Sequence, residues 1–300
     1  ALRAKIAEQP DVLRTFYPEH LPPAVEAVAI LLRNSAEARD AIDDTLSHSG
    51  ASIVLPRAAS RAEAHQALDG EGIVRLTGEG GSGKSGILKR LAMDAGGPAV
   101  IFTDNRMTAA TLAQHFGQLG IHEPAGTVFD AIAGQGEALC MIDGADRLLM
   151  SDRRAVVLDI LRAIRTCATH GQWRIVTSAR GYQDSDLVAE ALREAGFDRI
   201  GAQVVVGALS ADEVALVAKE FPPFGPLLKR PDLAEQTRSL FLLRDLLRRP
   251  SPPAQVPSEV DAADSWISGY GLTARELGHR SQTLAQIGDR LVSKPWEPPG

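Results

Sequence analysis

The chain has 300 residues, of which 44% are hydrophobic and 23% are charged, as in an ordinary globular protein with a sizeable core. These values exclude a largely disordered, collagenous or coiled-coil chain. The formal net charge is −6, with 13 basic and 19 acidic residues in 1–150 and 19 of each in 151–300, so neither half is a basic domain. Nucleic acid is therefore an unlikely partner by charge, although a local patch (Lys229, Arg230, Arg244, Arg248, Arg249) leaves that option open beside the simpler one of a solvated helix face.

Cysteine content and apolar runs indicate where the protein works. Cys140 and Cys167 lie inside apolar patterns and are expected to be reduced core residues of a cytoplasmic protein, without a disulfide or metal framework. The longest apolar stretch, Ala27–Leu32, is far too short to cross a bilayer, and no signal peptide is recognisable. Because the chain begins at Ala1 without Met and ends in a Pro-rich stub, we expect it to be part of a longer protein.

The predicted elements begin with helices and continue as alternating strands and helices. Residues 1 to about 50 have apolar residues at helical spacing. From Ile53 onward, short apolar runs alternate with helical stretches, the clearest of which runs from Asp152 to about His170. This pattern predicts an α/β fold with a five-stranded parallel sheet. The five expected strands are Ile73–Thr77, Ala99–Thr103, Ala138–Ile142, Arg174–Ser178 and Gln203–Val206.

Helices are expected again after the last strand. Leu209–Arg249 is predicted to be helical, beginning with Ser210 and Glu213 as a capping box, and a Pro-rich linker over 249–257 leads to a second helical stretch over 258–292. The expected domains are an N-terminal helical segment (1–50), a core with the parallel sheet (51–208), and a small helical domain (209–250), which the resemblance given below identifies as a lid. A linker with the start of a further helical module, for which a winged helix is one option, follows (251–300).

The strongest motif is a phosphate-binding loop between a predicted strand and a predicted helix. It matches G-x-x-x-x-G-K-[ST] and comprises Gly78, Glu79, Gly80, Gly81, Ser82, Gly83, Lys84 and Ser85, to which we add the following Gly86. Glycines allow successive N–H groups to point at one anion, and the helix N-terminus adds positive potential. Lys84 is expected to reach the β- and γ-phosphates and act in catalysis, and Ser85 to bind Mg²⁺. A Gly-rich turn with an incidental lysine is the weaker alternative.

A second motif places acids at the end of an apolar strand. Residues 138–142 are apolar and end at Asp143, with Asp146 three residues on, which is where doubly wound sheets bind ligands. We expect this strand to lie next to the phosphate loop, so that Asp143 binds Mg²⁺, usually through water. Asp146 is expected to orient or deprotonate the attacking water; alternatively, it caps the helix near Ser151 or pairs with Arg147.

A third motif ends the strand that begins at Trp173. We expect this strand to lie beside that of the phosphate loop and to direct Thr177, Ser178 or Arg180 at the γ-phosphate. An arginine there distinguishes triphosphate from diphosphate and acts as a catalytic sensor; the alternative is an ordinary surface arginine.

In this order and spacing, the three motifs resemble the STAND class of signal-transduction ATPases, and within it the NACHT-like enzymes of prokaryotic antiviral defence. The specific mark is a tiny residue after the metal-binding acid and a second acid two positions later, here Asp143-Gly144-Ala145-Asp146. Val54-Leu55-Pro56-Arg57 is similar to the motif that precedes the phosphate loop in this class, which implies that Arg57 contacts the nucleotide. The resemblance covers about residues 51–250.

The chain departs from the family pattern at three points. Arg147 occupies the place of a further acid, Ala179 displaces the sensor arginine by one position, and Ser239-Leu240-Phe241 stands where the lid usually has Gly-x-Pro. The resemblance implies a molecular switch that binds ATP or ADP with Mg²⁺ and hydrolyses ATP slowly. Such switches self-associate in the ATP state and respond to a sensed protein or other ligand through segments outside this chain.

Other classes of phosphate-loop protein are partly excluded by missing motifs. No Asn-Lys-x-Asp-type guanine reader follows a strand, which favours adenine, and no Leu-Ser-Gly-Gly-Gln transporter signature is present. Two alternatives to the switch remain from the sequence: a nucleic-acid-dependent ATPase of the AAA+ type, and a non-hydrolysing scaffold with bound nucleotide. The effector, the trigger and the oligomer size are not encoded in recognisable motifs.

Overall fold

The computed structural model describes residues 23–167, 173–230, 237–249 and 252, and these fall into two compact units. Unit 1 comprises residues up to 45 together with 54–208, and unit 2 comprises 46–53 and the residues from 209 onward. The expected helices within 1–22 and 258–292 lie outside the described residues. No helix in the described part of the chain is long and apolar enough to span a bilayer.

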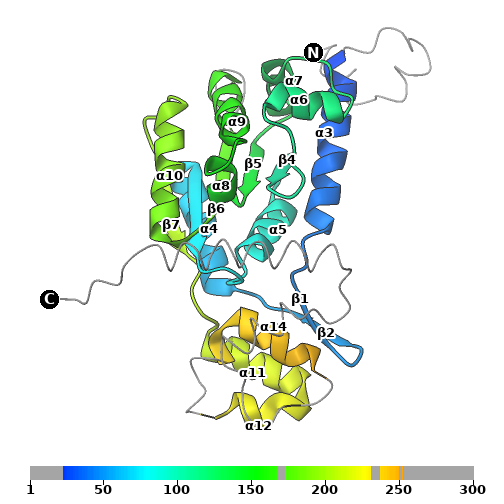
Figure 1. The fold of residues 1–300 in the computed structure, drawn as a ribbon, viewed down its shortest axis with the longest axis vertical. Helices are drawn as coiled ribbons and strands as arrows, with labels where there is room; N and C mark the ends of the chain where they lie inside the picture. The colour runs from blue at the N-terminus through cyan, green and yellow to red at the C-terminus, as the bar shows by residue number, and fades with distance from the viewer. Residues whose placement is uncertain (1–22, 168–172, 231–236, 250–251, 253–300) are drawn as a thin grey trace, which may run out of the picture. The chain divides into compact units, whose positions relative to one another are not determined.

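Unit 1 contains the predicted parallel sheet, and all five expected strands are confirmed (Figure 1). The strands are β3 (Ile73–Gly78), β4 (Ala99–Thr103), β5 (Ala138–Asp143), β6 (Trp173–Arg180) and β7 (Ala202–Val205). Their order in the sheet is β4-β5-β6-β3-β7, and every neighbouring pair is parallel.

Helices cover both faces of the sheet, which is why its strands are apolar on both sides. In β5, Cys140 and Ile142 belong to one core, whereas Leu139 and Met141 belong to the other. The first core packs against α3 (Pro23–Asp40), α6 (Leu112–Gln118), α7 (Ala125–Ala133), α8 (Ala145–Leu149), α9 (Arg154–Thr166) and α10 (Gly181–Glu194). The second packs against α4 (Ala58–Glu71) and α5 (Lys84–Asp94).

Helix α3 runs along β4 at the edge of the sheet (Figure 1). The Ser35 hydroxyl, buried on α3, donates to Leu31 O at 2.8 Å and accepts from the backbone N of Ile101 at 3.1 Å. Part of the backbone that β4 leaves unpaired is thereby satisfied by a helix side chain, and the edge strand is covered.

The expectation of helix throughout 1–50 is wrong after Asp40. A β-hairpin follows, formed by β1 (Thr45–His48) and β2 (Ala51–Val54), and it belongs to unit 2. Its turn residues Ser49 and Gly50 have φ of 50° and 86°, the backbone of a two-residue hairpin turn. The Ser49-Gly50 dipeptide is a turn signal, but the apolar residues at helical spacing before it led to the prediction of a helix.

In the described residues, unit 2 contains the hairpin and the helices α11 (Ala211–Glu220), α12 (Gly225–Leu228) and α14 (Leu240–Arg248), with a 3₁₀ turn at Pro222–Phe224. The predicted capping box is confirmed: the Ser210 hydroxyl accepts from Glu213 N at 3.2 Å, and the Glu213 carboxylate accepts from Ser210 N at 2.9 Å. Buried residues on α14 (Leu242, Leu243, Leu246, Leu247) form the apolar face of that helix.

Candidate nucleotide-binding site

The phosphate loop lies between β3 and α5, as its sequence predicts. Two of its glycines are required by geometry: a Cβ on Gly78, at φ 149°, would lie 2.4 Å from Val206 O, and Gly83 caps α5 at φ 97°. Other residue types are strained at both positions. The loop can therefore fold tightly and turn its N–H groups inward only with glycine at these points.

Lys84 is folded into this loop and is almost completely buried. Its ammonium group donates to the carbonyl oxygens of Gly78 at 2.7 Å and Glu79 at 2.8 Å, with Ser82 Oγ at 3.4 Å. Burial lowers the pKa of Lys84, and the nearby carboxylates of Asp146 and Asp143 act in the opposite direction. The structure thus brings the predicted lysine and both predicted acids into one electrostatic environment.

Asp143 ends β5, but its strand is not the neighbour of the phosphate-loop strand that we expected. Strand β6 lies between them, with Ile142 paired to Thr177 and Gly78 paired to Arg180. Because all three strands run in parallel, their carboxyl ends still meet at one edge of the sheet. Asp143 therefore reaches this edge from β5, which is separated from the phosphate-loop strand β3 by one strand, β6.

Ser178 on β6 joins Asp143 to the backbone that follows it. Its hydroxyl donates to the Asp143 carboxylate and accepts from the backbone N of Gly144 at 2.8 Å. Ser178 is buried, and its contacts are to the acid rather than to an open ligand space. Ser178 therefore holds Asp143 in place, and its orientation towards a phosphate stays a prediction.

Asp146 and Arg180, which the sequence placed in separate roles, form an ion pair. Arg180 Nε lies 2.9 Å from Asp146 Oδ2, and Asp146 is only 1% exposed, whereas the Arg180 side chain is 54% exposed. Asp146 Oδ1 is buried without a hydrogen-bond partner among the described residues. Of the two alternatives to the catalytic role, pairing with Arg147 is wrong, and the helix α9 has no side-chain cap at its start.

Arg147 pairs instead with Asp104, a site residue that sequence reasoning missed. Their Nη1 and Oδ2 atoms are 3.0 Å apart, and Asp104 directly follows β4, whose Thr103 is paired with Asp143. Burial raises the pKa of Asp104, with Asp143 adding to the effect and Arg147 opposing it. A polar residue directly after an apolar strand was the signal that could have identified it.

Gly144 is enclosed by this ion pair. Its φ is 70°, and a Cβ on it would lie 2.9 Å from Arg147 Nη2 and 3.2 Å from Asp104 Cγ. Backbone conformation and crowding both favour glycine here. The presence of glycine directly after Asp143 thus has a physical reason in this chain.

Arg57 is buried, but the contacts that define its position are to the backbone. Its guanidinium donates to Gly207 O at 2.6 Å and to Ala208 O at 3.4 Å, directly after the Val206 carbonyl that adjoins Gly78. The residue itself has φ 45° at the start of α4. Arg57 therefore lies close to the beginning of the phosphate loop, and its contact with a nucleotide stays a prediction.

The residues present fit a magnesium–nucleotide site of the expected kind. Ser85 is in the first turn of α5, and Asp143 offers a carboxylate already oriented by Ser178; oxygen ligands of this kind suit Mg²⁺, which retains several waters. In the described residues, no group of three or more His, Cys, Asp or Glu side chains forms a metal cluster. A metal held by Ser85, Asp143, water and phosphate oxygens needs no such cluster.

Strand order and motif positions together define the class. A parallel sheet of order β4-β5-β6-β3-β7, with a G-x-x-x-x-G-K-[ST] loop after β3 and an acid after β5, is an α/β fold of the P-loop NTPase, AAA+-like kind.

Comparison with solved structures finds distant similarities. The Walker-type ATPase PABY2304 of Pyrococcus abyssi is 13% identical with a TM-score of 0.49, over 79% of this chain and 76% of that one. The ORC2 protein of Aeropyrum pernix, in ADPNP–ADP complexes, is 15% identical with a TM-score of 0.43, over 73% and 68%. AMPPCP-bound DnaA from Aquifex aeolicus is 14% identical with a TM-score of 0.41, over 62% and 58%. No protein-family model and no curated protein matches the sequence.

Proposed function

We propose that this chain is an ATP-binding switch module of the STAND, NACHT-like type, which hydrolyses ATP slowly and controls self-association within a larger signalling or antiviral-defence protein. The observation that carries the proposal is the position of Lys84, buried within a glycine loop and sharing its surroundings with Asp143 and Asp146. An ammonium group enclosed by backbone carbonyls in this way is placed to exchange them for phosphate oxygens.

The proposed chemistry assigns one task to each residue. The loop N–H groups and Lys84 bind the phosphates, while Ser85 and Asp143 hold Mg²⁺, which when bound neutralises charge on the phosphate oxygens. Asp146 orients the attacking water or accepts its proton through Oδ1, the oxygen without a hydrogen-bond partner in the described residues. Arg180 contacts the γ-phosphate after leaving Asp146.

Slow turnover follows from the same contacts. Asp146 is almost fully buried and pairs with Arg180 through its other oxygen, while Arg147, in the place of a further acid, pairs with Asp104. Under this proposal, the Asp146 carboxylate can act on water only after Arg180 has left it to bind the γ-phosphate. Hydrolysis is therefore tied to a rearrangement of Arg180, as a switch requires.

Two further functions are distinguished from the switch by their readouts. A nucleic-acid-dependent AAA+ ATPase would show DNA- or RNA-stimulated turnover that falls steeply with salt. A non-hydrolysing scaffold would retain co-purified nucleotide without turning it over. The charge distribution and the buried, paired state of Asp146 favour the slow switch over the motor.

The test compares the mass of the protein in ATP and in ADP by light scattering, with turnover measured on the same samples. We expect higher mass with Mg·ATP than with Mg·ADP, and loss of this difference in Lys84→Ala. Asp146→Asn should retain the ATP-dependent mass and lose turnover. Lys219→Ala, which removes an exposed lysine from α11, is the matched control and should behave as the parent. Equal mass in both nucleotides, with nucleotide bound, would reject the switch.

A further inference from the structure

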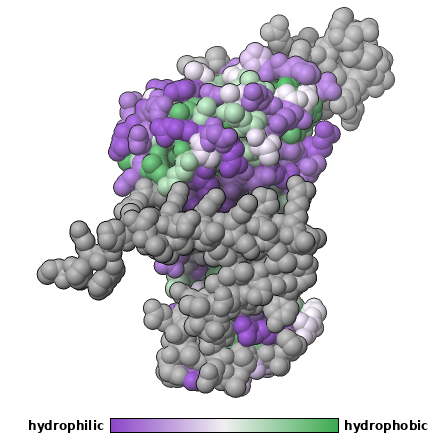
Figure 2. Space-filling view, in the orientation of Figure 1, coloured by the Kyte–Doolittle hydropathy of each residue, from purple (hydrophilic) through white to green (hydrophobic). Residues whose placement is uncertain are grey.

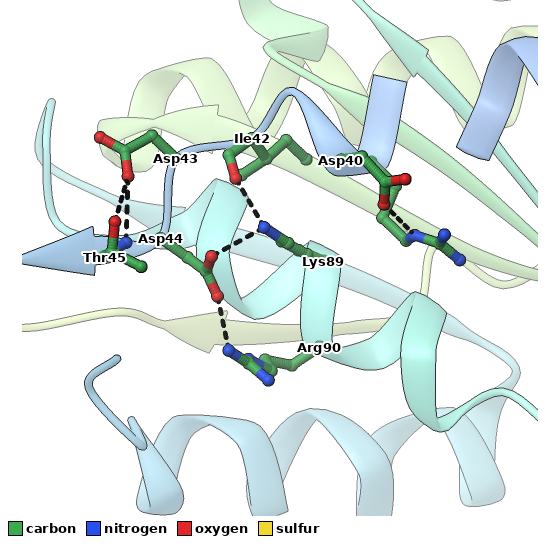
Figure 3. Close-up of polar contacts among 8 residues, drawn as sticks. Asp40, Ile42, Asp43, Asp44, Thr45, Lys89 and Arg90 are labelled. Atoms are coloured by element: carbon green, nitrogen blue, oxygen red, sulfur yellow. Dashed lines mark hydrogen bonds and ion pairs between the residues drawn. The ribbon is translucent and has the colours of Figure 1, made fainter. Parts of the chain in front are cut away.

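The short segment between α3 and β1 is fixed to the helix that follows the phosphate loop. In Figure 3, Lys89 and Arg90 of α5 both point to the carboxylate of Asp44. Lys89 Nζ lies 2.8 Å from Asp44 Oδ1, and an Arg90 terminal nitrogen lies 2.8 Å from Oδ2. Lys89 also donates to Ile42 O at 2.8 Å, so both the side chain and the backbone of the segment are held.

The acidic member of these two ion pairs is buried and its cationic partners are partly buried, unlike the ion pair nearest to it in sequence. The Asp44 side chain is 7% exposed, whereas Asp40, which pairs with Arg39 at 3.0 Å, is 68% exposed. Burial alone would raise the pKa of Asp44. Hydrogen bonds and charge from Lys89 and Arg90 together lower the pKa by more than burial raises it, so the net pKa is below its ordinary value. The carboxylate is thus held ionised between two cations.

Asp44 also lies beside the first turn of α5. A Cβ added at Gly86 would lie 3.4 Å from Asp44 Cβ, so a larger residue than glycine would be in van der Waals contact with Asp44, and Gly86 directly follows Lys84 and Ser85. Because a helix is stiff over two turns, a shift at its N-terminus is transmitted to Lys89 and Arg90 and so to Asp44.

Two residues beyond Asp44, the chain enters unit 2. Leu46 on β1 is 2% exposed and belongs to that unit. Within it, His48 Nδ1 is 2.8 Å from Leu247 O, and the His48 ring meets the Phe224 ring edge-on at a centroid distance of 4.8 Å. The hairpin is therefore built into the helical unit, and Asp44 stands at the covalent connection to it.

We infer that Asp44 is a positioning residue that couples the phosphate loop to the hairpin β1–β2, and through the hairpin to the helices of unit 2. This inference rests on the proposed function, because it needs a nucleotide that changes the loop. Asp44 is the residue of this segment whose carboxylate contacts Lys89 and Arg90. The Asp43 carboxylate contacts the Thr45 hydroxyl at 2.8 Å, and Asp40 contacts Arg39.

Hydrogen exchange followed by mass spectrometry on the full chain tests the inference, with Mg·ATP and Mg·ADP compared in each variant. In the parent, we expect the two nucleotides to give different protection in residues 78–86, in 45–54 and in α11 and α14. Couplings between linked sites change equilibria by about 5-fold to 150-fold, and we expect differences in this range. In Asp44→Asn, which keeps the side-chain shape, the difference should persist in 78–86 and disappear in 45–54, α11 and α14.

A purely structural role would predict something else: lower stability, with the nucleotide-dependent difference intact in every segment. Asp40→Asn is the matched control and should behave as the parent, and Asp44→Glu should restore part of the difference. Lys89→Met combined with Arg90→Met should reproduce the Asp44→Asn result from the other side of the contact. An undiminished difference in 45–54 in Asp44→Asn overturns the inference, whereas no nucleotide effect in 78–86 of the parent overturns the proposed function itself.

Discussion

Replacing Gly144 by alanine tests the geometry of the candidate site without removing a charged group. The backbone at Gly144 has φ 70°, a left-handed conformation that costs an alanine about 1–2 kcal/mol. The new methyl group would also lie 2.9 Å from Arg147 Nη2 and 3.2 Å from Asp104 Cγ, so this ion pair must move. The Arg147 side chain is 50% exposed, so the pair contributes at most about 1 kcal/mol.

The two contributions together predict that Gly144→Ala lowers the free energy of unfolding by about 1–3 kcal/mol. For a unit of the size of unit 1, the midpoint of thermal unfolding should fall by roughly 2–12 °C. Because Gly144 N is bonded to Ser178 Oγ at 2.8 Å, the variant should also displace the group that orients Asp143, and Mg·ATP should bind more weakly.

Urea unfolding followed by circular dichroism measures the effect, with Gly126→Ala as the control. Gly126 lies in α7, where a Cβ would meet nothing within 4 Å and φ is not in the left-handed range, so alanine should leave stability unchanged or raise it by up to about 1 kcal/mol. If Gly144→Ala is as stable as Gly126→Ala, the account of strain and crowding at this position is wrong.

Further predictions concern the neighbouring side chains. Ser178→Ala should lower the free energy of unfolding by about 2–3 kcal/mol, since it removes a buried hydroxyl that contacts Asp143 and Gly144 N; urea unfolding checks this, and an unchanged midpoint would contradict it. Burial lowers the pKa of His115 below its ordinary 6.5, so the unfolded chain takes up a proton that the folded chain does not. The stability that His115 contributes above pH 6.5 should therefore be lost as the pH falls from there towards its folded pKa. His115→Phe should unfold with a smaller loss between pH 7 and pH 5 than the parent, and an equal loss would refute this assignment.

Much of the fold was predictable because local and global signals agree. The β5 sequence Ala138-Leu139-Cys140-Met141-Ile142 is apolar at every position, as a strand buried on both faces must be, and the loop motif fixes where β3 ends and α5 begins. Ser210 and Glu213 predicted the start of α11 by their spacing alone. In each case, the residues that carry the signal are close together in the chain.

The remaining features depend on contacts between distant residues. Whether Asp146 pairs with Arg147, its neighbour, or with Arg180, 34 positions on, depends on the strand order, which places β6 between β5 and β3. The Asp104–Arg147 pair likewise depends on the register of β4 against β5. The hairpin was missed because its four-residue strands carry little periodicity and its partners are in helices about 170 to 200 residues later.

The described surface of the protein does not indicate a particular partner. On the part of unit 1 that is visible in Figure 2, hydrophilic residues dominate and the hydrophobic ones form small separate spots. Among the described residues, the large hydrophobic side chains that are exposed (Met93, Met150, Val205, Leu216, Phe241) are scattered over different elements. Single exposed apolar residues of this kind are ordinary and do not define a docking face.

The central claim is that the loop around Lys84 binds a nucleoside triphosphate, and calorimetric titration of Mg·ATP into the parent and into Lys84→Ala tests it most directly. Loss of two charge-assisted contacts to phosphate, at about 1.5–3 kcal/mol each, predicts binding weaker by about 100-fold or more in the variant, with Lys219→Ala unchanged. Equal affinity of the parent and Lys84→Ala for Mg·ATP would contradict the account.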